Sequence, residues 1–175
     1  MASGSSSAPS FLQARPELQF VDLLIPDMNG IVRGKRVDPS ALAKVFERGV
    51  AMPASIFALN IQGTTVEETG LGLDIGEADR VCLPIENTLT MEPWQKRPTA
   101  QLLLTMYELD RETPFFADPR VVLQNIMKRF EELGLLHRQG SQVILHPTAL
   151  PYARAIASTF DAYLEPREQR FSHAV

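Results

Sequence analysis

The stretch from residue 20 to residue 37 constrains the fold of this chain most, because it predicts a β-hairpin. Two runs rich in aliphatic and β-branched residues, 20–25 and 31–37, flank a five-residue segment, 26–30, that ends in Asn-Gly. Asn-Gly readily supplies the positive φ angles of a tight strand connection. The two runs are therefore expected to form antiparallel strands.

Other segments predict the remaining elements of an α+β domain. Residues 38–49 begin with Asp-Pro and end in glycine, which predicts a short capped helix with Leu42, Val45 and Phe46 on one face. Further strands are predicted from three apolar runs: 54–59, 80–84 and 101–107. The last run has consecutive apolar residues, as expected of a buried central strand.

The clearest predicted helix covers residues 118–134. Asp118 is its expected N-cap and Gly134 its stop. The stripe expected to be apolar consists of Val122, Ile126, Phe130 and Leu133. Beyond Gly134 the composition shifts toward Arg, His, Gln and Pro, with one more amphipathic candidate over residues 151–164.

Charge and composition exclude several classes of protein. A net charge of -4 and a pI near 5.4 argue against a nucleic-acid binder, since counterion release needs a concentrated basic face. The chain contains neither a charged-then-apolar leader nor a run of about 18 apolar residues, so no membrane association is expected. Cys82 is the only cysteine, which excludes an intramolecular disulfide. We therefore expect a cytoplasmic chain.

Several residues that often carry chemistry are interpreted as structural. Cys82 lies in an apolar run, where cysteine behaves as a small hydrophobe, and the histidines have spacings unlike those of zinc sites. The histidines are His137, His146 and His173. Four large residues are interpreted as packing residues: Met52, Met91, Met106 and Trp94.

An acidic, glycine-containing loop follows the third predicted strand. Its acids match no calcium-loop spacing, and its glycines miss the spacing of a phosphate-binding loop, so no metal site is predicted. The acids are Glu67, Glu68, Asp74, Glu77 and Asp79. The glycines are Gly70, Gly72 and Gly76.

Several segments, in order and in register, resemble the amino-terminal region of the glutamine synthetase family. They are the hairpin 20–37, the loop Gln62-Gly63-Thr64-Thr65, the segment 76–84, and the segment 117–120. The branch most similar joins glutamate to polyamines or other amines rather than to ammonia. The resemblance implies a β-grasp domain, a mixed sheet crossed by a helix, followed by a long helix and an unmatched tail.

The resemblance also implies a division of the chain into four parts. Residues 18–112 would be the β-grasp domain. For residues 1–17 a disordered start is expected from composition, because residues 1–9 have almost no side chains able to pack and so cannot offset the entropy of being ordered. Residues 113–134 would be the connecting segment and the helix that opens the catalytic domain in the family. Residues 135–175 are the unmatched tail, for which a shifted reading frame, a truncation and a natural origin all stay open.

The loop Gln62-Gly63-Thr64-Thr65 has two readings. In ammonia-using family members an aspartate stands in this loop and reaches the active site of the next subunit, so the resemblance implies a substrate loop. The amide of Gln62 can hydrogen-bond but cannot act as a base, which favours a different amine. Alternatively the loop is a polar turn, with Thr64 or Thr65 capping a helical turn through Glu67 or Glu68.

The catalytic domain of the family begins with a strand that carries two glutamates one residue apart. That spacing places both carboxylates on one face of the strand, where they can hold the magnesium or manganese bound to ATP. Residues 135–145 contain no such pair. We therefore expect no complete catalytic or metal site in this chain, and ATP with magnesium or manganese only in a complete family enzyme.

Two functions are compatible with these features. The first is the amino-terminal fragment of an ATP-dependent glutamate-ammonia or glutamate-amine ligase, which acts in nitrogen or polyamine metabolism when complete and is inactive alone. The alternative is a free-standing β-grasp binding module that docks on intact ligase subunits or on another protein. The expected partner is a second copy of the chain or a full-length ligase subunit.

Overall fold

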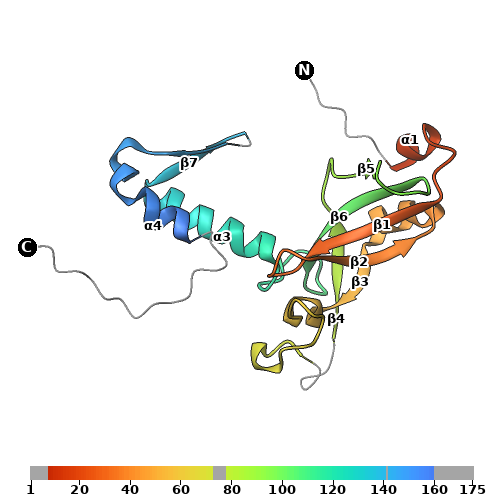
Figure 1. Ribbon diagram of the computed structural model, residues 1–175, viewed down its shortest axis with the longest axis horizontal. Helices are drawn as coiled ribbons and strands as arrows, with labels where there is room; N and C mark the ends of the chain where they lie inside the picture. The colour runs from red at the N-terminus through yellow and green to blue at the C-terminus, as the bar shows by residue number, and fades with distance from the viewer. Residues whose placement is uncertain (1–7, 73–77, 141, 160–175) are drawn as a thin grey trace, which may run out of the picture. The chain divides into compact units, whose positions relative to one another are not determined.

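The computed structural model describes residues 8–72, 78–140 and 142–159. The chain divides into two compact units, and the boundary, between Val122 and Leu123, falls inside a helix. The elements of the first unit are shown in Figure 1: α1 (Ala8–Gln13), β1 (Phe20–Pro26), β2 (Val32–Val37), η1 (Pro39–Ala41), α2 (Leu42–Arg48), β3 (Val50–Pro53), η2 (Ala54–Ala58), η3 (Glu67–Thr69), β4 (Asp79–Pro84), β5 (Thr90–Met91) and β6 (Thr99–Tyr107).

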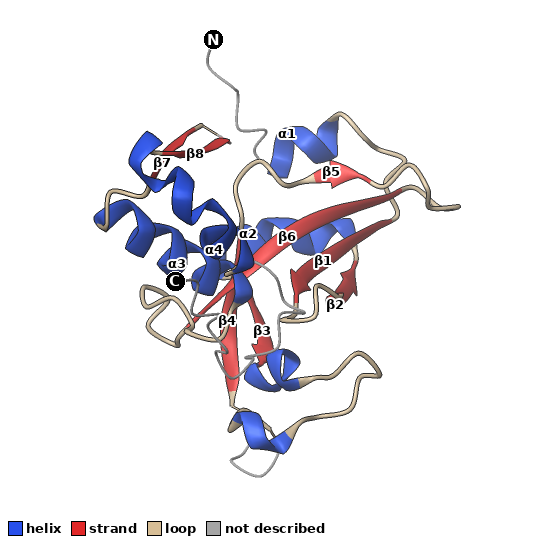
Figure 2. Ribbon diagram, turned by 60° about the vertical axis from the view of Figure 1, so that its left-hand side comes forward, coloured by secondary structure: helices blue, strands red, loops and turns tan. Residues whose placement is uncertain are grey.

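The described strands of the first unit form one mixed sheet in the order β2-β1-β6-β4-β3, with β5 also paired to β6 (Figure 2). β1 and β6 are parallel, and the other pairs are antiparallel. β6 is central, as predicted. Lys35 Nζ on β2 donates to the carbonyl of Ala51 on β3 at 2.8 Å, so the sheet curls until its two end strands are bridged.

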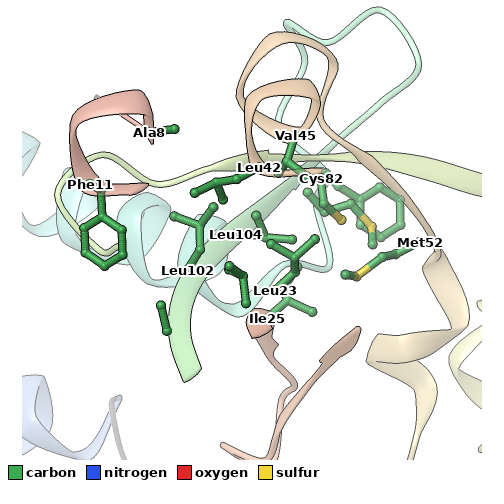
Figure 3. Close-up of a cluster of buried hydrophobic side chains, with 14 of the residues drawn as sticks. Ala8, Phe11, Leu23, Ile25, Leu42, Val45, Met52, Cys82, Leu102 and Leu104 are labelled. Atoms are coloured by element: carbon green, nitrogen blue, oxygen red, sulfur yellow. The ribbon is translucent and has the colours of Figure 1, made fainter. Parts of the chain in front are cut away.

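The core of this unit lies between one face of the sheet and the helices α1 and α2. Alternate residues of β1 and β6 point inward, because successive side chains of a strand face opposite sides. Figure 3 shows Leu23, Leu102 and Leu104 gathered with Leu42 of α2. The predicted α+β fold, a β-grasp sheet crossed by a helix, is thereby confirmed.

The hairpin is confirmed, but its turn differs in detail from the prediction. Gly30 has a φ of 75°, whereas Asn29 is not among the residues with positive φ. Asp27 N donates to Ile31 O at 2.9 Å, and Gly30 N donates to Asp27 O at 3.0 Å. The connection is therefore a three-residue loop closed by a left-handed glycine, so a single positive φ is enough.

The strand predicted over residues 54–59 is wrong, because these residues form the 3-10 helix η2, and β3 precedes it. Four of its five residues are buried, a pattern that period-2 alternation does not produce. They are Ala54, Ser55, Phe57 and Ala58. In α2, Leu42 and Val45 are buried as predicted, but Phe46, one helical turn after Leu42, is 40% exposed.

The start of the chain is ordered earlier than predicted. Residues 8–13 form α1, in which Ala8 and Phe11 are buried in the core of the first unit. Arg15 lies over the Phe11 ring, 4.1 Å from its centroid. The predicted disorder is therefore wrong for residues 8–17, since Phe11 offers the sheet a large apolar side chain; residues 1–7 lie outside the described residues.

The long helix α3 (Pro119–Glu132) is confirmed, and its N-cap Asp118 is fully buried. Asp118 Oδ1 accepts from Arg120 N at 2.8 Å, while Oδ2 accepts from Thr105 Oγ1 at 2.9 Å and from Met106 N at 2.8 Å. One carboxylate thus caps the helix and accepts two hydrogen bonds from residues near the end of β6. No described helix is long and apolar enough to cross a membrane.

The second unit contains the rest of α3 and the elements that follow it, which are β7 (Leu136–Gln139), β8 (Gln142–Leu145), η5 (Pro147–Tyr152) and α4 (Ala153–Ser158). Its core consists of Met127, Leu136, Ala149 and Ile156.

The predicted apolar stripe is wrong at Leu133, which is 62% exposed, because α3 ends at Glu132 and Gly134 turns the chain with a φ of 66°. Of the helix predicted over 151–164, residues 160–164 lie outside the described residues.

Candidate functional site

Residues 60–64, which contain most of the predicted substrate loop, form a five-residue turn. Asn60 N donates to Thr64 O at 2.9 Å, and Gly63 N donates to Asn60 O at 3.0 Å. The Asn60 side chain holds the inside of the turn, since its Oδ1 accepts from Gln62 N and from Thr64 N, both at 2.9 Å. Gly63 adopts a φ of 82°, which glycine tolerates without strain. The loop main chain is therefore fixed by its own first side chain.

The hairpin turn 27–31 has the same construction. Its main-chain bonds join the same relative positions, and Asp27 Oδ1 accepts from Asn29 N at 2.8 Å and from Ile31 N at 2.9 Å. In both turns an Asp or Asn precedes a glycine by three residues. Sequence reasoning missed the role of Asn60, although this repeated Asx-x-x-Gly pattern was the available signal.

Arg33 joins the two turns. Its Nε lies 2.7 Å from Asp27 Oδ2, and its Nη2 donates to the carbonyl oxygen of Asn60 at 2.9 Å. Asn29 Nδ2 adds a second link by donating to the Leu59 carbonyl at 2.9 Å. The Asp27 side chain is fully buried, so its charge is compensated by two amides and one guanidinium. The loop 60–64 is thus attached to the end of the hairpin.

The exposed side chains of the loop are non-titratable, and they include the apolar Ile61, which is 73% exposed. Gln62 and Thr64 are exposed, while Thr65 pairs with Leu59 across an isolated bridge at the base of the loop. An amide and hydroxyls can donate and accept hydrogen bonds, but they cannot act as a general base at neutral pH. The capping alternative is wrong, because the N-cap of η3 is Val66, whose own side chain makes no capping hydrogen bond.

Cys82 is buried, as predicted, and burial raises the pKa of its thiol to about 12, with the charge of Asp118 as a smaller contribution. A thiol with such a pKa is not a nucleophile at neutral pH, which confirms its interpretation as a small hydrophobe. Among the packing residues, Met52 and Met106 are buried, and Met91 packs on the core. Trp94 is 69% exposed, so its packing prediction is wrong.

The structure gathers no group of three or more metal-ligating side chains among the residues that it describes. Of the predicted incidental histidines, His137 is exposed, and His146 Nδ1 lies 2.8 Å from Thr148 Oγ1. Four of the residues considered for chemistry lie outside the described part: Asp74, Gly76, Glu77 and His173.

The strand that follows α3 does not fit a divalent cation. β7 carries Leu136, His137, Arg138 and Gln139, so it offers no carboxylate. Arg138 Nε lies 2.7 Å from Glu131 Oε1, and its guanidinium raises the local positive charge. Magnesium and manganese prefer several oxygen ligands, which this strand does not supply.

No family model matches the chain. The chain is 42% identical over 125 residues to gamma-glutamylputrescine synthetase PuuA of Escherichia coli K12, covering 71% of the chain and 26% of PuuA. It is 30% identical over 119 residues to the glutamine synthetase of Staphylococcus aureus MW2, covering 67% and 23%. With the glutamine synthetase of Thermotoga maritima it shares 25% identity over 128 residues, covering 72% and 26%. The chain therefore spans about a quarter of the length of these relatives.

Solved structures have the same fold. The crystal structure of a novel glutamine synthase homolog matches with a TM-score of 0.56 at 23% identity, covering 68% of this chain and 28% of the homolog. The structure of GmaS without ligand matches with a TM-score of 0.54 at 19% identity, covering 89% of this chain and 37% of GmaS. At these identities the likeness concerns the fold alone.

Proposed function

Since this chain belongs to the glutamine synthetase family, we propose that it is the amino-terminal β-grasp part of an ATP-dependent ligase that joins glutamate to an amine. One observation carries the proposal, namely the 42% identity to gamma-glutamylputrescine synthetase over 71% of the chain. The identities to two glutamine synthetases are lower, at 30% and 25%. This difference favours a polyamine-type amine over ammonia, and hence a role in polyamine or nitrogen metabolism, with the cytoplasm as the expected compartment.

The loop geometry supports an amine-contacting role for residues 62–65. The turn is held by two hydrogen bonds to the Asn60 side chain, Gln62 and Thr64 are exposed, and no residue from 60 to 66 is titratable. In the family this loop reaches the active site of the neighbouring subunit. We propose that Gln62, Gly63, Thr64 and Thr65 line the amine side of such a site, where the Gln62 amide accepts from a substrate ammonium without deprotonating it.

The proposal assigns ATP, magnesium or manganese and the glutamate site to the remaining part of a complete enzyme. β7 supplies no carboxylate ligand, so the chain alone is proposed to be inactive. Its proposed partner is a second copy of the chain or a full-length ligase subunit, because a loop that acts in a neighbour's site needs that neighbour.

A chimera tests this function. Residues 8–134 of the chain replace the matching quarter of PuuA, and kcat/KM is measured with putrescine and with ammonia, in parallel with the purified chain alone. The chimera is expected to form γ-glutamylputrescine and the chain alone to form none. A chimera carrying Gln62→Asp should shift toward ammonia, and one carrying Gln62→Asn is the matched control. Product from the chain alone, or a folded chimera without ligase activity, would contradict the proposal.

One observation favours the free-standing binding module as a second candidate. The second unit has its own core, in which Met127 of α3 packs with Leu136, Ala149 and Ile156, so part of the helix is covered within the chain. A module that folds alone needs such cover. Light scattering of the purified chain with and without full-length ligase subunits tests the module, since a docking module requires a stable mixed complex, and a chain that stays strictly monomeric in the mixture contradicts it.

A further inference from the structure

We propose that Arg33 is a positioning residue, which holds the loop 60–64 in place and so determines where Gln62 and Thr64 point. The functional meaning of this position rests on the proposed function, in which the loop contacts the amine substrate. The positioning itself concerns only the described contacts between β2, the hairpin turn and the loop.

The Arg33 side chain is anchored by the buried carboxylate of Asp27. Its Nε lies 2.7 Å from Asp27 Oδ2, and the other carboxylate oxygen of Asp27 accepts two backbone amides of the hairpin turn. The Asp27 side chain is fully buried and the Arg33 side chain is 19% exposed. A carboxylate held by three donors has little freedom, and a charge-assisted bond to it is stronger than a neutral one.

The Nη2 end of the Arg33 guanidinium binds the loop. Arg33 Nη2 donates to the Asn60 carbonyl at 2.9 Å. A Cβ added at Gly63 would lie 3.8 Å from Arg33 Nη1, so the guanidinium also lies close to Gly63. The planar fork of arginine has donors in fixed directions, which lets one side chain join two turns at a set angle.

The hydrogen bonds within the loop do not determine how the loop is oriented relative to the hairpin. The bonds to Asn60 Oδ1 fix the shape of the turn, but they join residues of the same turn. Its placement comes from Arg33, from the bond of Asn29 Nδ2 to Leu59 O, and from the bridge between Leu59 and Thr65. Of these links, Arg33 provides the charged one.

The chain offers a matched control on the same strand. Arg36 makes a bidentate pair with Asp22, at 2.7 Å and 2.8 Å, and no contact of it with the loop is present among the described residues. A substitution of Arg36 removes a guanidinium and an ion pair from β2 while leaving both turns intact. It therefore separates loss of a charge on β2 from loss of the loop contact.

The test is amide hydrogen exchange of the full chain, measured residue by residue. Arg33→Met is expected to speed exchange at Asn60 and Val66 about tenfold, because these two amides close the base of the loop by donating to Thr64 O and Ala58 O, and the base opens once the charged link is lost. The change in β6 should be less than about twofold. Arg33→Lys, which keeps the charge but not the fork, should recover only part of the protection. Arg36→Met should leave the loop amides unchanged.

Because Arg33→Met leaves the buried Asp27 carboxylate without its cation, the double variant Asp27→Asn with Arg33→Met is measured as well. Fast loop exchange in this folded double variant supports the proposal. Loop exchange that stays at the wild-type rate in it, or that rises equally in Arg36→Met, overturns the proposal. This measurement needs no ligase activity, so an inactive chimera contradicts the proposed function alone, and unchanged loop exchange contradicts the positioning alone.

Discussion

The first unit is organised around a curled sheet of the described strands, whereas the second is organised around the end of one helix and a two-stranded hairpin. In the first, buried polar groups such as Asp27 and Asp118 are held by several backbone amides each. In the second, the charged contact between Glu131 and Arg138 lies at the surface. Backbone geometry therefore limits substitution in the first unit, whereas a few apolar contacts maintain the second.

The largest expected effect comes from Gly34→Ala in β2. A Cβ at this position would overlap the carbonyl oxygen of Leu23 on the neighbouring strand, which cannot move without breaking the pairing of β1 and β2. We expect a loss of about 3 kcal/mol or more in the free energy of unfolding, measured by urea denaturation.

Gly140→Ala is the matched control in the second unit. Gly140 has a φ of 60°, but a Cβ there would meet nothing within 4 Å. The cost should be only that of a left-handed non-glycine residue, about 1 kcal/mol. Equal losses for the two variants would show that close backbone approach does not distinguish the units.

The second prediction compares equivalent truncations in the two cores. Leu104→Ala, at a residue that is 1% exposed, is expected to cost about 3 kcal/mol, because it opens a cavity beside several buried neighbours. Ile156→Ala, at a residue that is 6% exposed in the smaller core, is expected to cost about 2 kcal/mol.

Amide hydrogen exchange shows which residues each truncation destabilises. Ile156→Ala should lower protection at Met127 and Leu136 while the amides of β6 keep theirs, as expected for locally unfolding units. A uniform loss over both units in the Ile156→Ala variant would mean that they unfold as one body and would remove the contrast between them.

The third prediction concerns the loop of the first unit. Asn60→Ala removes the acceptor of Gln62 N and Thr64 N and should cost about 1 kcal/mol, seen as faster exchange of these two amides. Asn60→Asp keeps a side-chain oxygen in the same place and imitates Asp27 in the hairpin turn. Its loop amides should stay protected; protection lost equally in both variants would argue against the side-chain acceptor.

Local signals explain what the sequence predicted well. The hairpin, α2, the central strand β6 and the long helix each carry their own turn, cap or run of apolar residues, so their existence depends on residues close in the chain. The strand predicted over residues 54–59 was wrong because a short apolar run is compatible with either a strand or a buried helical turn. The prediction that Leu133 belongs to the apolar stripe of the long helix was wrong because a pattern of apolar residues does not show where a helix ends.

The candidate site was predictable only in part. The loop 62–65 could be found by resemblance, and its turn could have been found from Asx-x-x-Gly. The contact of Arg33 with Asn60 joins residues that are 27 positions apart, and only the curl of the sheet brings them together. No residue close to Arg33 in the sequence indicates this role, yet its side chain is only 19% exposed and binds two turns.

The smallest expected effect is a dependence of the second unit on acidic pH. The hydrogen bond from Arg138 lowers the pKa of Glu131 below its ordinary value of 4.5. A carboxyl with a lowered folded pKa stabilises the fold above its unfolded pKa, and this stabilisation is lost as pH falls through the folded value. Protection of β7 amides should therefore decrease below about pH 4.5. Glu131→Gln should remove this decrease, whereas Asp110 of the first unit, whose pKa is lowered by Thr113, keeps its own acid response in that variant. Because the Glu131–Arg138 pair is exposed, the change should be smaller than any of the effects above, and a decrease that persists in Glu131→Gln would assign it to other carboxyls.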